Sequence, residues 1–182
     1  MSSTKKKKML FKILIVGDGG VGKTTLLHRY KNNQFLSDTK MTLGVDFFMK
    51  QIKMPEHTIM LQLWDFGGQQ QFRHMLRNYA LGASGAILVY DTTRLNTLDN
   101  IEEWIDICRS KRSDLPILLV GTKIDLDSPP IDEKYIKDIS DNFKIFQHVK
   151  ISSKTGENVT EVLDRTAQEM VFYSVKMKKG GK

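Results

Sequence analysis

Blocks of apolar residues along the chain, separated by polar and turn-forming stretches, predict strands and helices that alternate. Met9 to Val16 is an apolar block of strand length, and a helix is expected to begin at Lys23 and to run to about Lys31. Val45 to Met54 and Thr58 to Trp64 predict two strands joined by a short turn that contains Pro55. Because so short a connection joins antiparallel neighbours, we expect this pair to form a hairpin.

Two further apolar runs, Ala86 to Tyr90 and Ile117 to Val120, have turn residues on both sides, as the central strands of a parallel sheet do. A helix around Leu98 to Arg109 is expected between them. Strands that alternate with helices in this way predict an α/β fold with a mostly parallel sheet.

Two helices are predicted in the last third of the chain. The first follows the loop forced by Ser128, Pro129 and Pro130, and its apolar face is expected to consist of Ile131, Tyr135, Ile136 and Ile139. The second is long and is marked by apolar residues at helical spacing, namely Val159, Val162, Leu163, Met170 and Val171. Gly180 and Gly181 are expected beyond it, in a loose chain end.

The composition predicts one soluble domain of the cell interior. The 182 residues suit a single domain, and no run approaches the roughly 18 apolar residues of a membrane span. The lysine-rich N-terminus is not followed by the apolar segment of a secretory signal. Cys108 is the only cysteine, which excludes an internal disulfide and favours a reducing, cytoplasmic location.

The net charge of +7 is concentrated at the two ends of the chain. Residues 1–8 and 176–182 hold four lysines each, and the rest of the chain has 20 basic and 21 acidic residues. We therefore expect a nearly neutral domain at 9–175 between two basic tails, and no nucleic-acid binding, which would need a basic face on the domain itself. The lysines form either solvated chain ends or a weak contact with an anionic membrane surface, where each contributes about 1 kcal/mol.

The strongest local motif is the glycine-rich turn from Gly17 to Thr24, which matches G-x-x-x-x-G-K-[ST] between the first strand and the first helix. Glycines let backbone amides approach phosphate oxygens, and the helix N-terminus adds its positive dipole end. Lys23 would reach the β- and γ-phosphates, and the Thr24 hydroxyl would bind Mg²⁺. The residues expected to hold the phosphates are Gly17, Gly19, Gly20, Val21, Gly22, Lys23, Thr24 and Thr25.

Two further motifs follow strand ends. Asp65 to Gln69 spells D-x-x-G-Q: the carboxylate would hold Mg²⁺, the Gly68 amide would approach the γ-phosphate, and the Gln69 amide would orient an attacking water. Thr122-Lys123-Ile124-Asp125 places a carboxylate that can accept from N1–H and the N2 amine of guanine, a donor pair that adenine lacks. The alternatives are that Gln69 is an exposed helix-start residue and that Asp125 is a helix cap.

From about Leu10 to Val175 the chain resembles the Ras superfamily and, within it, the Rab family most. The resemblance rests on the ordered motifs Gly17–Thr24, Asp65–Gln69, Thr122–Asp125 and Ser152–Lys154, with Thr42–Phe47 and Gly85–Asp91 in support. It implies a P-loop GTPase fold with a six-stranded sheet, five strands parallel and one antiparallel, and helices on both faces.

The resemblance assigns roles that local patterns do not. It implies that Thr42 binds Mg²⁺ together with Thr24 and Asp65, that Phe35 packs edge-on against the guanine, and that the stem of Lys123 covers the base. The segments 36–44 and 66–78 would be the two switches, which GTP holds and hydrolysis releases.

The same likeness implies that the loop Ser152-Ser153-Lys154 meets guanine O6. Phe47, Trp64 and Tyr79 resemble the aromatic trio that many Rab proteins present to effectors, although plain core packing is an equal alternative for these three residues.

The chain also departs from the Rab pattern. Thr122 replaces the usual Asn, as in Rho-like members, so guanine binding should survive. Phe66-Gly67 replaces Thr-Ala and is similar to the second switch of Arf-like and Roc-like members, and Gln70 replaces an acid. No cysteine for prenylation lies near the C-terminal end and Ser2 excludes N-myristoylation, so either the tail is shortened or the protein acts without a lipid.

These observations predict a monomeric GTP-binding switch that hydrolyses GTP to GDP in Rab-like signalling or membrane traffic. An exchange factor, a GTPase-activating protein and effectors are the implied partners, and no arginine is obviously placed as a catalytic finger. The rival interpretations are a nucleotide-binding module without turnover and another P-loop enzyme such as an ATPase or kinase.

Overall fold

Six strands and five α-helices alternate in the computed structural model, which describes residues 6–37, 42, 44–70, 73–128 and 131–180. The strands are β1 (Lys7–Val16), β2 (Val45–Lys53), β3 (His57–Phe66), β4 (Gly85–Asp91), β5 (Ile117–Thr122) and β6 (Gln147–Lys150). The helices are α1 (Lys23–Asn32), α2 (Arg73–Tyr79), α3 (Ile101–Arg109), α4 (Glu133–Asn142) and α5 (Val159–Gly180), with a short 3₁₀ helix, η2 (Leu95–Leu98).

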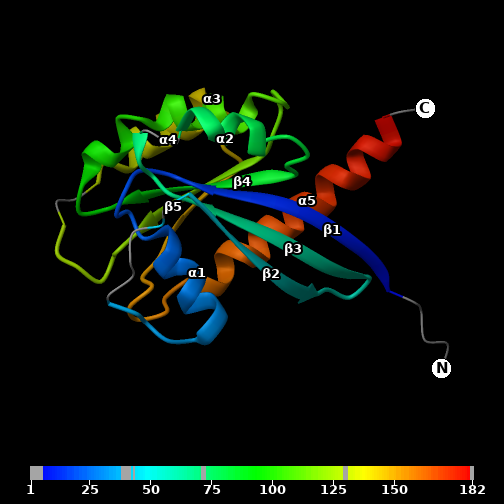
Figure 1. Cartoon of the computed structure of the whole chain (residues 1–182), viewed down its shortest axis with the longest axis horizontal. Helices are drawn as coiled ribbons and strands as arrows, with labels where there is room; N and C mark the ends of the chain where they lie inside the picture. The colour runs from blue at the N-terminus through cyan, green and yellow to red at the C-terminus, as the bar shows by residue number, and fades with distance from the viewer. Residues whose placement is uncertain (1–5, 38–41, 43, 71–72, 129–130, 181–182) are drawn as a thin grey trace.

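The strands form one sheet in the order β2-β3-β1-β4-β5-β6 (Figure 1). Only the pair β2–β3 is antiparallel, with Val45 opposite Phe66, and the other neighbouring strands are parallel. The predicted α/β fold, with five parallel strands and one antiparallel hairpin strand, is therefore confirmed.

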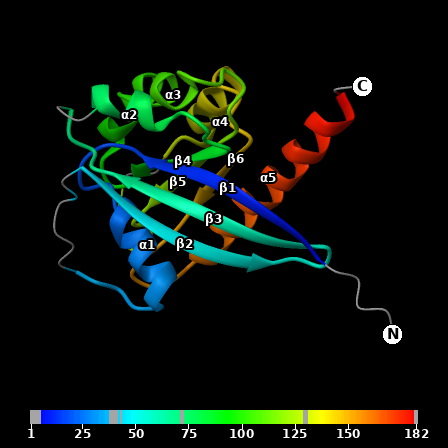
Figure 2. The ribbon, with the colours of Figure 1, turned by 45° about the vertical axis from the view of Figure 1, so that its right-hand side comes forward.

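Helices cover both faces of the sheet, as expected (Figure 2). Each face has its own hydrophobic core. On one face Leu26 and Leu27 of α1 and Val162 of α5 pack against the strands. On the other, Leu76 of α2 and Trp104 of α3 pack there, and the only cysteine, Cys108, is buried among them. The neighbouring strand residues alternate between the two cores because successive side chains of a strand point to opposite faces.

The parallel strands bring the candidate motifs together, since β1, β4 and β5 all end at the same edge of the sheet. The loop after β1 turns there with Gly17 at φ 136°, and a Cβ on Gly17 would overlap the carbonyl oxygen of Val89 in β4. Glycine is therefore required at this position for the close approach of the loop to the neighbouring strand.

Three predicted details were wrong. The helix expected from about Leu98 to Arg109 ends as predicted but begins later, at Ile101. Leu98 instead ends η2, a 3₁₀ turn in which the Thr97 hydroxyl donates to the Arg94 carbonyl oxygen and accepts from the Asp91 amide. Tyr135 is 46% exposed, since it lies a third of a turn away from the buried Ile136.

The third error concerns the chain end: Gly180 lies within α5, because no helix-breaking residue interrupts the run before it. At the other end β1 begins at Lys7, two residues before the predicted start, and pairs with β3 from Lys7 onward. The division into a domain at 9–175 and two tails stays a prediction.

The local sequence did not single out β6 or α2. Both are short, and neither has an apolar run of its own. Among the described helices, none has the length and apolar content needed to cross a bilayer.

Candidate functional site

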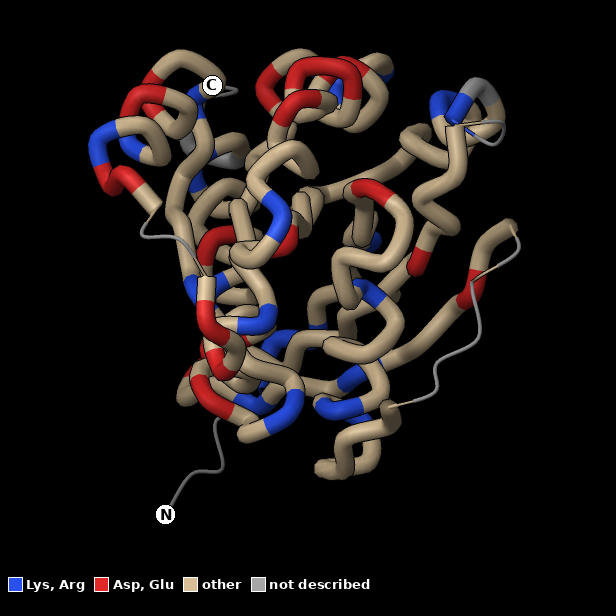
Figure 3. Tube along the Cα trace, turned by 90° about the vertical axis from the view of Figure 1, so that its left-hand side faces the viewer, with Lys and Arg blue, Asp and Glu red and all other residues tan. Residues whose placement is uncertain are grey.

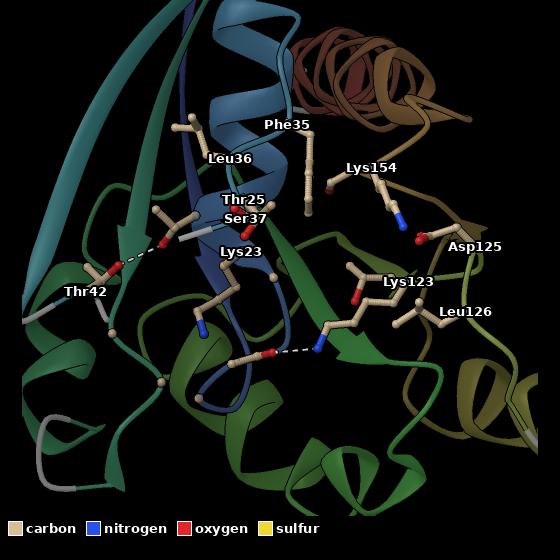
Figure 4. A pocket seen from close by; sticks show the side chains of 18 of the residues that line it. Lys23, Thr25, Phe35, Leu36, Ser37, Thr42, Lys123, Asp125, Leu126 and Lys154 are labelled. Carbon is tan, nitrogen blue, oxygen red and sulfur yellow. Dashed lines mark hydrogen bonds between the residues drawn. The ribbon is translucent and has the colours of Figure 1, made fainter. Parts of the chain in front are cut away.

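A pocket of about 580 Å³ lies at the edge of the sheet where β1 and β5 end (Figure 4). It is lined by four segments that the sequence motifs single out, together with the chain after α1. The lining residues are Gly19, Gly20, Gly22, Lys23, Thr24, Thr25, Phe35, Leu36, Ser37, Thr42, Phe66, Gly67, Gly68, Thr122, Lys123, Asp125, Leu126, Ser153 and Lys154.

Lys23 is the cation at the centre of the glycine-rich loop. Its side chain is buried, and its ammonium donates hydrogen bonds to the carbonyl oxygens of Gly17 at 2.7 Å and Asp18 at 2.8 Å. Burial lowers the pKa of Lys23 to about 8, although the carboxylates of Asp65 and Asp18 act in the opposite direction. A buried ammonium with a lowered pKa is stabilised by an anion, so this position favours a phosphate.

The loop itself supports the same chemistry. Gly20 and Gly22 have φ angles of 72° and 99°, which favour glycine, and Gly22 directly precedes α1. Because Gly22 has no side chain to cap the helix, the first amides of α1 remain directed at the pocket, where the positive end of the helix dipole lies. Val21, in contrast, is fully buried in the core and is not among the lining residues.

Three oxygen-bearing side chains meet beside Lys23. The Thr24 hydroxyl lies 2.6 Å from Asp65 Oδ2. It also lies 2.7 Å from the Thr42 hydroxyl, a contact drawn as the dashed line at Thr42 in Figure 4. Burial raises the pKa of Asp65, against the hydrogen bond from Thr24, and its second oxygen, Oδ1, is buried with no hydrogen-bond partner among the described residues.

This cluster fits Mg²⁺, which prefers hydroxyl, carboxylate and phosphate oxygens and uses few protein ligands. An unpartnered buried carboxylate oxygen is the kind of acceptor that a metal-bound water would satisfy. Within the described residues no group of three or more His, Cys, Asp or Glu side chains forms an all-protein metal cage. Because Mg²⁺ prefers six oxygen ligands, Thr24, Thr42 and Asp65 would share the ion with water or phosphate oxygens.

Gly67 and Gly68, which follow β3, lie against neighbouring loops. The Gly67 amide donates to the Gly44 carbonyl oxygen at 2.9 Å, and a Cβ on Gly68 would overlap the backbone of Gly17 and Asp18. Gly68 therefore brings its own backbone to the phosphate end of the pocket. Gln69 follows it directly but is not among the lining residues.

The opposite end of the pocket has the composition of a base site. Figure 4 shows Phe35, Lys154 and Asp125 pointing into this end, whereas the Lys123 ammonium is directed at the Gly20 carbonyl oxygen. The carboxylate of Asp125 is held by the Ser152 hydroxyl, which donates to Oδ1 at 2.6 Å. That contact explains why Ser152 is fully buried behind the lining and does not reach the pocket itself.

Lys123 connects the two ends. Its ammonium lies 2.6 Å from Asp91 Oδ2 and donates to the Gly20 carbonyl oxygen at 3.1 Å. Burial alone would raise the pKa of Asp91, but hydrogen bonds from Lys123, Thr93 and Arg94 outweigh it and lower the pKa. The stem of Lys123 is thereby stretched along the pocket wall, where it can cover a planar ring.

Thr122 lines the pocket, as the sequence suggested, but its hydroxyl is engaged by the protein backbone. Its hydroxyl lies 2.5 Å from the Val21 carbonyl oxygen and 3.0 Å from that of Tyr90, so it ties the phosphate loop to β4. Ser153 lines the pocket with a buried hydroxyl that has no partner among the described residues. The hydroxyl of Ser153 is thus available to a ligand, whereas that of Thr122 is occupied.

Several polar residues of the site were missed from the sequence. Asp91 organises Lys123 and Arg94, and the Arg94 guanidinium lies 3.3 Å from the Gly19 carbonyl oxygen. Arg73 reaches the side chain of Asp18 at 2.9 Å. The one available signal was an aspartate at the end of a buried strand, at Asp91, since the partners of the two arginines are distant in sequence.

Comparison with known proteins places the chain among well-described relatives. The family model described as "Ras family" matches residues 12–172. The chain is 35% identical over 181 residues to Ras-related protein Rab-11C of Dictyostelium discoideum, covering 98% of this chain and 80% of that protein. It is 38% identical over 154 residues to Ras-related protein RABA6b of Arabidopsis thaliana, covering 84% of this chain and 67% of that one.

Proposed function

Because the chain belongs to the Ras family and is therefore a GTPase, we propose that it is a Rab-like switch that hydrolyses GTP slowly and selects partners by its bound nucleotide. The observation that carries the proposal is one pocket with a buried lysine and an oxygen cluster at one end and a fixed carboxylate at the other. This arrangement suits a guanine nucleotide with its phosphates on Lys23 and its base on Asp125.

At the phosphate end, the amides of the glycine-rich loop and the Lys23 ammonium would hold the β- and γ-phosphates. Thr24, Thr42 and Asp65 would hold Mg²⁺, which when bound neutralises charge on the phosphate oxygens. The contact between the Thr24 and Thr42 hydroxyls supports this assignment, because it places the first switch directly beside the loop. Loss of the γ-phosphate would weaken the interactions that hold Thr42 beside the loop.

At the base end, the Asp125 carboxylate would accept hydrogen bonds from N1–H and N2–H of guanine. Phe35 and the Lys123 stem would contact the ring, and Ser153 and Lys154 would meet O6. Ser152 acts one step behind, because its hydroxyl fixes the carboxylate. Adenine, the base of ATP, has no proton on N1 and no amine at C2, so it would donate no hydrogen bond to this carboxylate. This argues against the rival interpretation as an ATPase or kinase.

Hydrolysis would proceed by attack of a water on the γ-phosphorus in line with the leaving GDP. The Gln69 amide would orient this water, and Lys23 and the loop amides would stabilise the charge that develops on the phosphate oxygens. Within the described residues Arg94 donates to the Gly19 carbonyl oxygen of the loop and is not among the lining residues. We therefore propose that a GTPase-activating protein supplies further stabilisation.

Partner recognition would use the surface of the hairpin that joins the switches. Phe47, Trp64 and Tyr79 lie in series, with ring centroids 5.2 Å apart for the first pair and 5.8 Å for the second. Phe47 is 43% exposed, so the cluster is more than core packing and offers aromatic surface to an effector. An exchange factor would act on the same switches, and the protein would function as a cytoplasmic monomer.

The location proposed is peripheral. Figure 3 shows acidic and basic positions interleaved over the described body, which leaves the lysine-rich ends as the feature that would attract an anionic membrane. This membrane contact would be weak, because lysine side chains attract an anionic surface without inserting an acyl chain into it.

Single-turnover hydrolysis of bound GTP tests the proposed function. The wild type is expected to release phosphate at about 10⁻⁴ to 10⁻³ s⁻¹ without a partner, the range of Ras-type GTPases. Gln69→Leu should slow release at least about tenfold while GDP affinity stays unchanged, because the amide is assigned to the water and not to ground-state binding. Gln51→Leu, the same change at an exposed position of β2, is the matched control.

Two results would contradict the proposal. Absence of turnover in the wild type with tight GTP binding would make the chain a binding module. Equal rates for Gln69→Leu and the wild type would make Gln69 a surface residue. A pulldown that compares GTP-analogue and GDP forms then tests the switch, since partner capture must depend on the nucleotide.

A further inference from the structure

A buried arginine connects the second switch to the phosphate loop. Arg73 is the first residue of α2, and only 9% of its side chain is exposed. Its guanidinium forms an ion pair with Asp18 at 2.9 Å and another with Glu103 of α3, and it lies 4.6 Å from the ring centre of Trp104. These partners fix the position of the guanidinium, because a buried charge without a partner is strongly destabilising.

Asp18 is the point at which these contacts meet. Besides Arg73, its carboxylate accepts hydrogen bonds from Asn100 Nδ2 at 2.9 Å and Trp104 Nε1 at 2.8 Å. Its backbone carbonyl accepts from the Lys23 ammonium at 2.8 Å. One residue of the phosphate loop is therefore bonded to the phosphate-binding lysine through its backbone and to the second switch through its side chain.

We propose that Arg73 is a positioning residue for hydrolysis: it fastens the start of α2 to Asp18 and so holds Gln69, four positions earlier, beside the phosphate loop. The inference rests on the proposed function of Gln69. Gly68 already abuts the backbone of Asp18, so the segment that carries Gln69 is attached to the loop at both of its described ends. Holding a catalytic group within a fraction of an ångström accounts for large rate factors, which are lost when its support is loosened.

The ion pairs of Arg73 with Asp18 and Glu103 are separate from the apolar packing that holds α2 to the core. Arg73, Asp18 and Glu103 belong to none of the apolar clusters, and Leu76 holds α2 to the core independently. Removal of the guanidinium is therefore expected to loosen the first turn of α2 without detaching the helix. Asp18 keeps its hydrogen bonds to Asn100 and Trp104 in that case, so the loop itself retains its shape.

Arg73→Met tests the proposal, with Arg73→Lys as the conservative variant and Arg77→Met as the control at an exposed position of the same helix. Arg73→Met is expected to slow single-turnover hydrolysis about tenfold while the Kd for GDP changes less than about threefold. Arg73→Lys should recover part of the rate, since lysine keeps the charge but not the fork of donors. Arg77→Met should match the wild type.

A double-mutant comparison shows whether Asp18 transmits the effect. Asp18→Asn should slow hydrolysis as well, and Asp18→Asn with Arg73→Met should be no slower than the slower single variant, because both remove the same contact. Independent, multiplying effects would overturn the proposal. So would hydrolysis by Arg73→Met at the wild-type rate, or a loss of rate matched by equal losses of GDP affinity and Tm in both Arg73 variants.

Trp104 provides a readout that turnover does not. In a Trp64→Phe background it is the only tryptophan, and its emission should change when Arg73→Met removes the guanidinium from its ring. Unchanged emission would mean that the contact is not made in solution and would overturn the proposal. A wild type that binds GTP without turnover would instead refute the proposed function, so the two failures are distinguishable.

Discussion

Replacing Asp125 by Asn is expected to change which base the pocket prefers. In the structure the Ser152 hydroxyl donates to Oδ1 of Asp125 at 2.6 Å, which fixes the plane of the carboxylate. An Asn at this position would keep that contact through its own carbonyl oxygen. Its amide group would then face the base, and a donor would stand where the carboxylate accepts from guanine.

The magnitude follows from the two hydrogen bonds that are lost. A hydrogen bond to a charged group contributes about 1.5–3 kcal/mol, so two of them correspond to about 3–6 kcal/mol. At 1.4 kcal/mol for each factor of ten, the affinity for GDP should fall about 10²- to 10⁴-fold. Xanthine carries a carbonyl at C2, which would accept from the new amide, so XDP should bind the variant better than GDP. The Thr122 hydroxyl, bound to Val21, should contribute little to this exchange.

Competition binding of GDP, ADP and XDP to wild type and variant measures this effect. Asp127→Asn is the matched control, because Asp127 is exposed two residues further on and is not among the lining residues. If the wild type binds ADP as tightly as GDP, or if Asp125→Asn keeps the full preference for GDP, the carboxylate caps a helix and the base assignment is wrong.

Two more predictions concern charge away from the pocket. Vesicles containing anionic lipid should bind the protein weakly and release it when salt is raised, and neutral vesicles should not bind it; sedimentation measures this, and binding that survives high salt would contradict an electrostatic contact. His148, stacked on Tyr90, has its pKa lowered to about 4 by burial and by Lys150, against the effect of Glu133. The folded state therefore binds fewer protons than the unfolded state, so stability present above pH 6.5 should be lost as the pH falls toward 4, by up to about 3 kcal/mol and less where solvent screens the ring; urea unfolding should show a flatter acid limb for His148→Gln, and identical limbs would refute the assignment.

The sequence predicted those parts of the site that depend on residues close to one another along the chain. The glycine-rich loop needs a strand before it, a helix after it and glycines at fixed spacing, all of which are local. The alternation of apolar runs likewise predicted the parallel sheet and the hairpin. The apolar pattern of each strand shows by itself whether the strand is buried on one face or on both. β6, with one buried residue among four, carried no such signal.

What the sequence could not predict are contacts that the sheet order creates. Arg73 meets Asp18, 55 positions earlier, only because β3 lies beside β1 and α2 follows β3. From the sequence alone it is one basic residue in a polar stretch. Tyr135 shows the opposite error: its apolar ring suggested burial, but the helix turns it away from the sheet beside Ile136.

The burial of Cys108 has a practical consequence for labelling the protein at a chosen position. Its side chain is 1% exposed, and burial raises the pKa of its thiol to about 12, so the unreactive thiol form predominates near neutral pH. A cysteine introduced at an exposed position of the pocket lining, such as Ser37, would therefore take a maleimide dye alone and at unit stoichiometry. The rate at which the native thiol is modified would in turn report how often the core around α3 opens.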